Sequence, residues 1–495
     1  MSKFFSSIFC TFVLMSVSLA GCITDDALTV DGSERIIDIN LDGDSDPKIY
    51  GQVGGFVLFS ANDSVHGREL WRTSGVELTT EMVADIYVGA GSGIGQGDLI
   101  LGDHLYFLAK PSGSGYCEIY RSDGTDSGLE KLTEDLDLHC SGTRFMEALD
   151  DDRIVIANLG NMYVLDINTL TVQVVIVDAM TRMLQFGVVD TNNDLMYFLK
   201  QSEIYGLEPW VSDGTVSGTH MLKDIESGSG HSEPSDFVVA NNIVYFIAED
   251  DENGRELWKT DGTNSGTVRV TNWETCDGDA RKGVANLWES SSSHPAASMV
   301  VGKESGSLSA SPTMGRAAVT TDVLFFIGNK RHNCDSDSPG SYHGMLRSDG
   351  THEGTYTVYV QPGLGRLIAS EDGKSIYPIR EGYGSSFKKY SVNSNVTETV
   401  AEELHTHHNI RVTIQSGQFC EIDGVIYISM MDESGDSDTG YELWATDGTS
   451  DGTMMISDIN PGSGGSNPES FYCTSRTVYF SAEGEGGREL WKHRP

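Results

Sequence analysis

The sequence predicts an all-β fold built from repeated four-stranded antiparallel sheets, and three observations predict it. The 495-residue chain contains 56 glycines against 12 prolines, which favours many tight turns. Short apolar runs alternate with polar residues, as half-buried strands do. One turn sequence recurs: "RELWKTDGTNSGT" (255–267) returns as "YELWATDGTSDGT" (441–453) and "EPWVSDGTVSGT" (208–219).

The repeating unit contains four strands in about 48 residues, since Trp210 and Trp258 are 48 positions apart. A first strand such as "SDFVVANN" (235–242) leads into a second, "IVYFIAE" (243–249), and "ELW" is the third. A fourth strand such as "HMLKDI" (220–225) precedes a Gly/Ser-rich loop. Val, Ile, Tyr and Phe at alternate positions are typical of strands.

The repeated Asp-Gly-Thr sequence predicts a turn between the third and fourth strands. Asp accepts hydrogen bonds from backbone N–H groups ahead of it, and Gly tolerates a positive φ. Within "ELW", Leu is expected on one side of the sheet and Glu and Trp on the other. We interpret the aspartates as structural turn residues, because one active site does not need five copies. They are Asp123, Asp213, Asp261, Asp349 and Asp447.

These motifs resemble the ELWxxDGT repeats of a family of bacterial and archaeal surface proteins. The resemblance covers nearly all of the chain after its leader and is strong at 55–90, 195–270 and 425–491. It is weak at 150–190 and 367–420. It implies a propeller-like fold and no settled biochemical activity, so it informs the fold more than the function.

The two ends of the chain predict that the repeats close into a ring. The chain ends at "RELWKHRP" (488–495), after the third strand of a unit, and "RIIDINLDGDSDP" (35–47) matches a fourth strand and its loop. The N-terminal strand would therefore complete the last unit and remove the exposed sheet edges. We predict a β-propeller of about eight to nine four-stranded blades, closed by N- and C-terminal strands that share one blade. A pair of smaller propellers is the alternative. Second strands are expected near residues 56, 105, 153, 195, 243, 323, 376, 425 and 478.

The N-terminus has the properties of a leader sequence. An apolar run follows Lys3 and ends in "LAGC" (19–22), a small-residue cleavage site. This end resembles the lipobox of lipoproteins, which implies that Cys22 is acylated and becomes the first residue of the mature protein. An ordinary secretory signal peptide is the alternative.

We divide the chain into a lipoprotein signal peptide (1–21), a tether (22–34) and a repeat propeller (35–495). One unit carries a polar, Ser-rich loop insertion of about 40 residues at 277–316. No other stretch has the roughly 18 apolar residues that a membrane-spanning helix needs. We therefore expect an extracytoplasmic protein, anchored by lipid to the outer membrane or cell surface.

Six cysteines follow the leader, and an even number outside the cytoplasm favours disulfides. Six cysteines allow fifteen pairings, which spacing alone does not distinguish. The repeat alignment favours one set, because "FC" and "YC" occupy equivalent first strands of neighbouring units. The expected pairs are Cys117 with Cys140, Cys276 with Cys334, and Cys420 with Cys473.

The formal charge of −40 excludes nucleic acid as a partner, because such binding depends on Lys and Arg neutralising phosphates. An acidic loop near the N-terminus has oxygen ligands at alternate positions and a glycine, as calcium loops do. Ile49 stands where an EF-hand needs its bidentate Glu, so the loop is not an EF-hand. A solvated acidic loop is the favoured interpretation and calcium the alternative. The candidate ligands are Asp38, Asn40, Asp42, Asp44 and Asp46.

The function predicted from these features is binding. "HTHH" (405–408) fits a surface turn better than a zinc or copper site. The sequence has no G-x-S-x-G nucleophile motif, P-loop or dinucleotide fingerprint. We expect no catalysis but a monomeric adhesion scaffold for surface polymers, glycans or proteins. One alternative is a propeller-type polysaccharide hydrolase or lyase, with two carboxylates roughly 5–10 Å apart. The other is a purely structural envelope component.

Overall fold

The computed structural model describes residues 32–177, 185–240, 242–271, 299–302, 323–328, 344–360, 364–370, 374–380, 388–392, 396–399, 410–411, 419–432, 439–449 and 451–495. These residues form nine antiparallel sheets and one short 3₁₀ helix, η1 (Glu77–Thr79). The all-β prediction is therefore confirmed. None of the described helical structure has the length and apolar character to cross a membrane.

We number the sheets 1 to 9 in chain order. Sheet 1 is β2 (Lys48–Val53), β3 (Phe56–Asn62), β4 (Arg68–Thr73) and β5 (Glu81–Ala84); sheet 2 is β6 (Ile94–Leu101), β7 (His104–Ala109), β8 (Glu118–Ser122) and β9 (Glu130–Lys131); sheet 3 is β10 (Thr143–Ala148), β11 (Arg153–Asn158), β12 (Asn161–Asp166) and β13 (Thr171–Ile176). Sheet 4 is β14 (Gln185–Asp190), β15 (Leu195–Ser202), β16 (Gly206–Ser212) and β17 (His220–Met221); sheet 5 is β18 (Ser235–Ala240), β19 (Ile243–Asp250), β20 (Gly254–Thr260) and β21 (Val268–Arg269); sheet 6 is β22 (Met299–Gly302), β23 (Val323–Gly328), β24 (Gly344–Ser348) and β25 (Tyr356–Val360). Sheet 7 is β26 (Leu364–Ala369), β27 (Ser375–Arg380), β28 (Lys388–Ser391) and β29 (Val396–Thr399); sheet 8 is β30 (Ile410–Arg411), β31 (Phe419–Ile422), β32 (Val425–Asp432), β33 (Tyr441–Thr446) and β34 (Met454–Ser457); sheet 9 is β35 (Glu469–Cys473), β36 (Val478–Gly484), β37 (Gly487–His493) and β1 (Ser33–Arg35).

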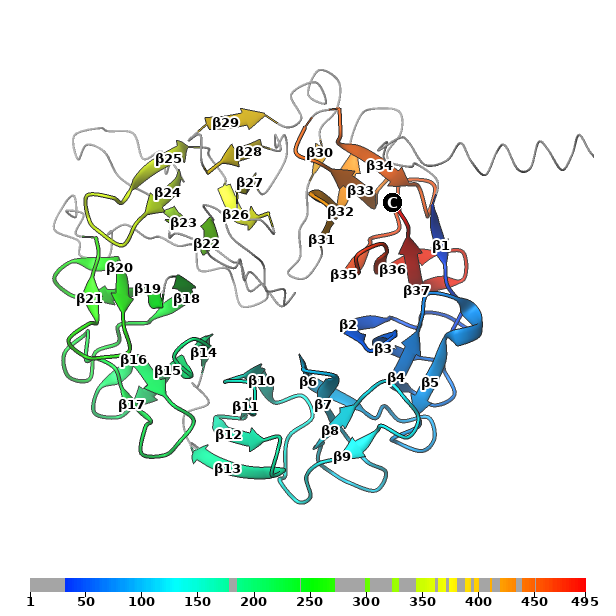
Figure 1. Ribbon diagram of the computed structural model, residues 1–495, viewed down its shortest axis with the longest axis horizontal. Coiled ribbons are helices and arrows are strands. Elements are labelled where there is room, and N and C mark those ends of the chain that lie inside the picture. The colour runs from blue at the N-terminus through cyan, green and yellow to red at the C-terminus, as the bar shows by residue number, and fades with distance from the viewer. Residues whose placement is uncertain are drawn as a thin grey trace, which may run out of the picture.

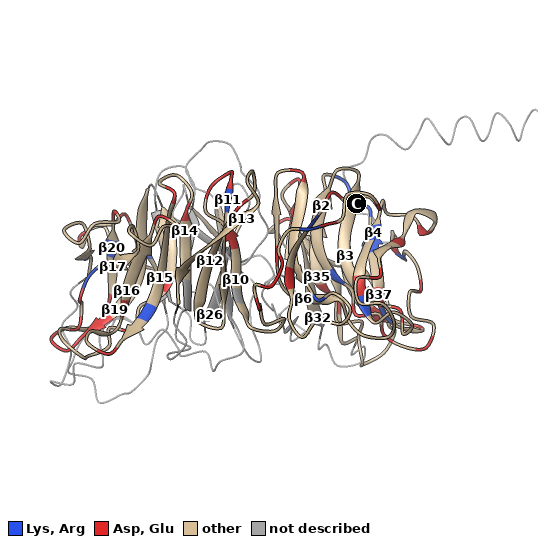
Figure 2. Cartoon of the chain, turned by 90° about the horizontal axis from the view of Figure 1, so that it is seen from below, with Lys and Arg blue, Asp and Glu red and all other residues tan. Residues whose placement is uncertain are grey.

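The sheets follow one another in chain order around a common centre (Figure 1). In each sheet other than sheet 8 the first strand lies nearest that centre and the fourth lies at the outside, whereas in sheet 8 these places are taken by β31 and β34 (Figure 1). Seen from the side, the strands stand roughly upright in a single layer (Figure 2). This propeller-like arrangement leaves loops at two opposite ends of the sheets.

The nine expected second strands are all present among the described residues, as β3, β7, β11, β15, β19, β23, β27, β32 and β36. The alternation inside "ELW" is also confirmed. Leu257 lies in a buried cluster with Leu324 of sheet 6, whereas Trp258 lies in a different cluster with Tyr197 of sheet 4. One strand thus seals both faces of its sheet, and burial of each large side chain contributes about 1.5–3 kcal/mol.

The two ends of the described chain meet in sheet 9. Strand β1 pairs antiparallel with β37, with Ser33 opposite His493 and Arg35 opposite Trp491. The predicted exchange of the N-terminal strand into the last unit is confirmed, so β37 has a strand on each side.

One boundary needs correction. Strand β22 lies inside 277–316 and pairs with β23, so this segment is not one uninterrupted loop. The backbone of the apolar "MVVG" pairs with one edge of β23. The sequence on either side is Ser-rich, so this short strand was not recognised. The rest of that segment, Cys22, Cys276, Cys334 and the histidines of 405–408 lie outside the described residues.

Candidate binding face

The two ends of the sheets carry different connections. At one end, here called the turn face, lie the links between first and second strands and the Asp-Gly turns. At the other end, the loop face, lie the hairpins between second and third strands and the connections to the next sheet. Pro495 follows β37 at the turn face, which is uppermost in Figure 2.

The five predicted aspartates do hold the turns. The Asp261 carboxylate accepts the backbone N–H of Thr263 at 3.0 Å and its hydroxyl at 2.7 Å, and Gly262 has a φ of 90°. Hydrogen bonding to the threonine lowers the pKa of Asp261, as it lowers those of Asp123 and Asp349. Their carboxylates are therefore used for structure. Equivalent bonds to Thr are made by Asp123, Asp213, Asp349 and Asp447.

The glutamate of "ELW" is a buried organiser of the loop face that sequence reasoning missed. Glu208 has no exposed surface, and its oxygens accept the N–H groups of Ile225 at 2.9 Å and Glu226 at 3.3 Å. The hydroxyl of Ser232 donates to it as well, at 2.7 Å. One carboxylate thus fixes both ends of a connection, which satisfies amide groups that would otherwise be buried unpaired.

The same arrangement recurs in three other sheets. Glu69 accepts the N–H groups of Ile86 and Tyr87, and Glu442 accepts those of Ile459 and Asn460. In sheet 9 the acceptor is Glu489, and the donors come from the other end of the chain: Ile39 at 3.1 Å, Asn40 at 3.4 Å and the Ser45 hydroxyl at 2.6 Å. The segment 36–47 therefore occupies the place that the matching sequence predicted.

Burial shifts the protonation of these glutamates. Desolvation raises the pKa of Glu69 and of Glu208 to about 7. It also raises the pKa values of Glu442 and Glu489. Backbone N–H groups oppose these shifts by stabilising the charged form.

The five candidate calcium ligands lie together in segment 36–47, but several of them bond within the protein. Asn40 donates to the carbonyl of Asp44 at 2.8 Å and accepts the N–H of Asp42 at 3.2 Å. Asp38 pairs with Arg35 at 3.1 Å, and Asp46 lies 3.9 Å from Arg68. The Asp44 carboxylate accepts the N–H of Arg488 at 2.8 Å.

Within the described ranges, no three His, Cys, Asp or Glu side chains are placed to hold a metal ion. Calcium stays a prediction.

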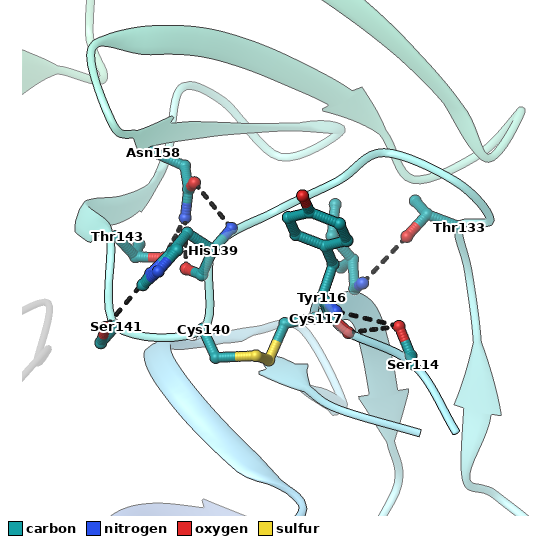
Figure 3. Close-up of a disulfide and its surroundings, with 10 residues drawn as sticks. Ser114, Tyr116, Cys117, Thr133, His139, Cys140, Ser141, Thr143 and Asn158 are labelled. Carbon is teal, nitrogen blue, oxygen red and sulfur yellow. Dashed lines mark hydrogen bonds between the residues drawn. A yellow bond between two sulfur atoms is a disulfide. The ribbon is translucent and has the colours of Figure 1, made fainter. Parts of the chain in front are cut away.

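Two of the three expected disulfides are present. Cys117–Cys140 ties the hairpin of sheet 2 to the connection that follows β9 (Figure 3). The N–H of Cys117 donates to the carbonyl of Leu138 at 2.8 Å, beside the disulfide. Cys420–Cys473 joins β31 of sheet 8 to β35 of sheet 9. Disulfides therefore restrain one loop-face connection and one junction between sheets.

Exposed apolar side chains form an arc over sheets 9, 1, 2 and 3 at the loop face. Most connections and hairpins along this stretch carry a large apolar side chain that is exposed to solvent. We call five of these exposed side chains the apolar arc: Leu41 (84% exposed), Val65 (62%), Val88 (72%), Tyr116 (47%) and Leu159 (49%).

Hydrogen bonds join the loops of the arc into one surface. The loops are 36–47, 63–67, 85–93, 110–117, 132–142 and 159–160. Each is bonded to the next, directly or through the strand end beside it. The bonds run from Asn62 N–H to Ser45 O (2.9 Å), Gly93 N–H to Arg68 O (3.0 Å), Val88 N–H to Ser112 Oγ (2.7 Å), Cys117 N–H to Leu138 O (2.8 Å) and Leu159 N–H to Gly142 O (3.1 Å).

Comparisons with known proteins leave the family open. No family model matches the chain, and no curated protein matches it. Solved structures with a similar course include an oligogalacturonate lyase in complex with manganese, at 11% identity and a TM-score of 0.37, covering 79% of this chain and 85% of that one. An oligogalacturonate lyase from Vibrio parahaemolyticus is 10% identical, with a TM-score of 0.37 and coverage of 94% and 97%. A puromycin hydrolase is 12% identical, with a TM-score of 0.36 and coverage of 79% and 50%. Likeness this low does not transfer an activity.

Proposed function

We propose that this chain is a lipid-anchored, extracytoplasmic binding scaffold of the ELWxxDGT-repeat surface proteins, a monomeric closed propeller of nine blades that binds surface polymers, glycans or proteins. Its parts are a signal peptide (1–21), a tether (22–34) and the propeller (35–495). The loop face is its binding surface.

Contacts between consecutive sheets support the closed ring. Lysine or arginine on a third strand donates to the turn carbonyl of the next sheet, as Lys259 does to Gly350 at 2.9 Å. The same bond crosses from the last sheet to the first, from Lys492 to Gly75. Other junctions are made by Arg72 with Gly124, Tyr106 with Tyr163, Arg153 with Asp213, Lys223 with Thr267, Phe325 with Tyr390, Tyr377 with Gly448, and Tyr427 with His493.

The position of Ser33 supports the choice of the loop face. Ser33 pairs with His493 at the turn face, and Cys22 precedes it by only 11 residues. A lipid on Cys22 would therefore hold the turn face toward the membrane. The loop face would point away from the membrane, toward external ligands.

One observation carries the proposal: in four sheets, backbone N–H groups of a loop-face connection donate hydrogen bonds to a buried glutamate. Binding surfaces gain affinity when their loops are ordered before the ligand arrives. The glutamates themselves argue against catalysis, because Glu69 has no exposed surface and its carboxylate is occupied by backbone N–H groups.

The test uses the mature chain with Cys22→Ser, which removes the lipid. We expect this protein to be retained on a glycan array or on isolated envelope polymers. We expect it to release no products from the same glycans. Radiolabelled fatty acid should enter the wild type and not the Cys22→Ser protein. Turnover without retention would overturn the scaffold.

A propeller-type polysaccharide hydrolase or lyase is the second candidate. The group that would carry it is Glu69, whose pKa is raised to about 7 mainly by burial and to a smaller extent by Asp85. Such a carboxyl group could act as an acid if a ligand opened its loop. Release of reducing ends or unsaturated products from a panel that includes oligogalacturonate would establish it. Absence of both turnover and retention would instead leave a structural envelope component.

A further inference from the structure

We propose that the apolar arc, as the ligand-contacting part of the scaffold proposed above, binds a cationic polypeptide segment with apolar side chains at regular spacing. The inference rests on the proposed function, and it adds a location and a partner chemistry to it.

The exposed apolar side chains of the arc come from separate loops. Leu41, Val88 and Tyr116 come from three different connections and hairpins of sheets 9, 1 and 2. These side chains are exposed to water without any folding benefit, and the loops that carry them are joined by hydrogen bonds, so a partner can contact several of them at once. A partner that covers the arc must itself present apolar groups at several points.

The charge of the same loops selects the partner. The six segments of the arc contain nine acidic residues and one basic residue, Lys110. Among the described residues, Asp42, Asp135 and Asp137 are exposed and have no ion pair. A cationic partner would relieve this repulsion, whereas an acidic glycan or nucleic acid would increase it. The nine acids are Asp38, Asp42, Asp44, Asp46, Asp63, Asp85, Glu134, Asp135 and Asp137.

The rigidity of the arc favours an extended or helical segment over a small molecule. The disulfide Cys117–Cys140 and the hydrogen bond from Val88 N–H to Ser112 Oγ (2.7 Å) hold neighbouring loops in register. Apolar residues on successive loops are therefore fixed anchor points for the apolar side chains on one face of a helix. Acids beside them would pair with Lys or Arg at the rim.

The probe is an 18-residue fluorescent peptide of Leu and Lys with helical spacing, and a Ser/Lys peptide of equal charge is its control. Fluorescence anisotropy measures both against the Cys22→Ser mature chain. We compare the triple variant Leu41→Ser, Val88→Ser, Tyr116→Ser with a matched triple variant at the turn face: Val76→Ser (43% exposed), Leu78→Ser (98%) and Val216→Ser (59%). All six side chains are exposed, so both proteins should fold, and circular dichroism checks this.

The expected result is at least a tenfold weaker affinity of the Leu/Lys peptide for the arc variant and an unchanged affinity for the turn-face variant. Asp135→Asn with Asp137→Asn should also weaken binding and flatten its salt dependence. Asn tolerates the positive φ of these positions, 59° and 51°, so the loop should keep its shape. The inference would be overturned if the arc variant bound the Leu/Lys peptide as tightly as the wild type does. It would also be overturned if the wild type bound the Ser/Lys peptide as tightly as the Leu/Lys peptide.

The experiment separates this inference from the proposed function. The arc variant is also applied to the glycan array and the envelope polymers. If wild-type protein binds those ligands but not the Leu/Lys peptide, the partner chemistry is wrong and the scaffold stands. If wild-type protein binds neither, both fail.

Discussion

The imidazole of His493 lies 3.4 Å from the hydroxyl of Ser33, across the junction of the two chain ends. In five other sheets the equivalent position holds a Ser or Thr whose hydroxyl bonds to a Thr at the start of the fourth strand, at 2.6–2.8 Å. His493 and Ser33 thus replace a hydroxyl pair that elsewhere lies within one continuous unit. The pairs are Thr73–Thr80, Ser212–Thr219, Thr260–Thr267, Ser348–Thr355 and Thr446–Thr453.

His493 should make the stability of the fold depend on pH. It has no exposed surface, and desolvation lowers its pKa to about 4 from 6.5. Between these values the unfolded chain binds a proton that the folded chain does not, so stability falls as the pH decreases from 6.5 to 4. A shift of this size corresponds to roughly 3–4 kcal/mol. Urea unfolding at pH 7 and 4.5 should show the loss in the wild type and a smaller loss in His493→Thr. An equal loss in both proteins would contradict this role.

Glu69 should act in the opposite direction. Because its pKa is raised to about 7, the folded protein holds a proton that the unfolded chain releases above 4.5. This contribution to the stability of the folded state is fully present below pH 4.5 and is lost as the pH rises through 7. Glu69→Gln should remove this dependence, and it should also lower stability by about 1 kcal/mol because one N–H group of the connection loses its acceptor. The exposed Glu77→Gln variant is the control, and an unchanged pH profile for Glu69→Gln would refute the assignment.

Local patterns predicted much of this fold, and the misses have physical causes. The alternation of "IVYFIAE" identified β19, and Asp261 was identified as a turn residue because Asp-Gly has a strong local preference. The loop-holding role of Glu208 could not be predicted from one strand, since its partners lie 17 to 24 residues away and depend on burial. The sequence did contain one indication of this role. The repeats keep a glutamate two positions before Trp, whereas a residue that only faced solvent would be expected to vary. Strand β22 was missed because four residues are too few to show a period.

The disulfide between Cys420 and Cys473 should stabilise the junction of sheets 8 and 9. It closes a separation of 53 residues, for which loop-closure entropy predicts about 4 kcal/mol. The double variant Cys420→Ser, Cys473→Ser should therefore unfold at lower urea concentration than the wild type. Cys117→Ser, Cys140→Ser, which opens a separation of 23 residues, is the comparison and should lose about 3 kcal/mol. Non-reducing peptide mapping verifies the disulfide in the wild type. If the wild type and the first variant then have similar stability, the disulfide does not stabilise the junction of sheets 8 and 9.

The N-terminal segment should be required for a stable ring. Deleting residues 30–47 removes β1, exposes one edge of β37 and leaves the buried carboxylate of Glu489 without Ile39, Asn40 and Ser45 as donors. An unpaired buried acceptor costs about 1–3 kcal/mol, and the loss of the strand adds to it. Thermal unfolding of the deletion variant should occur at clearly lower temperature than that of a control lacking only 23–29. Adding a synthetic peptide of residues 30–47 should restore part of the stability, because the peptide can pair with the edge of β37 that the deletion exposes. If the deletion leaves thermal unfolding unchanged, the chain ends do not close the structure.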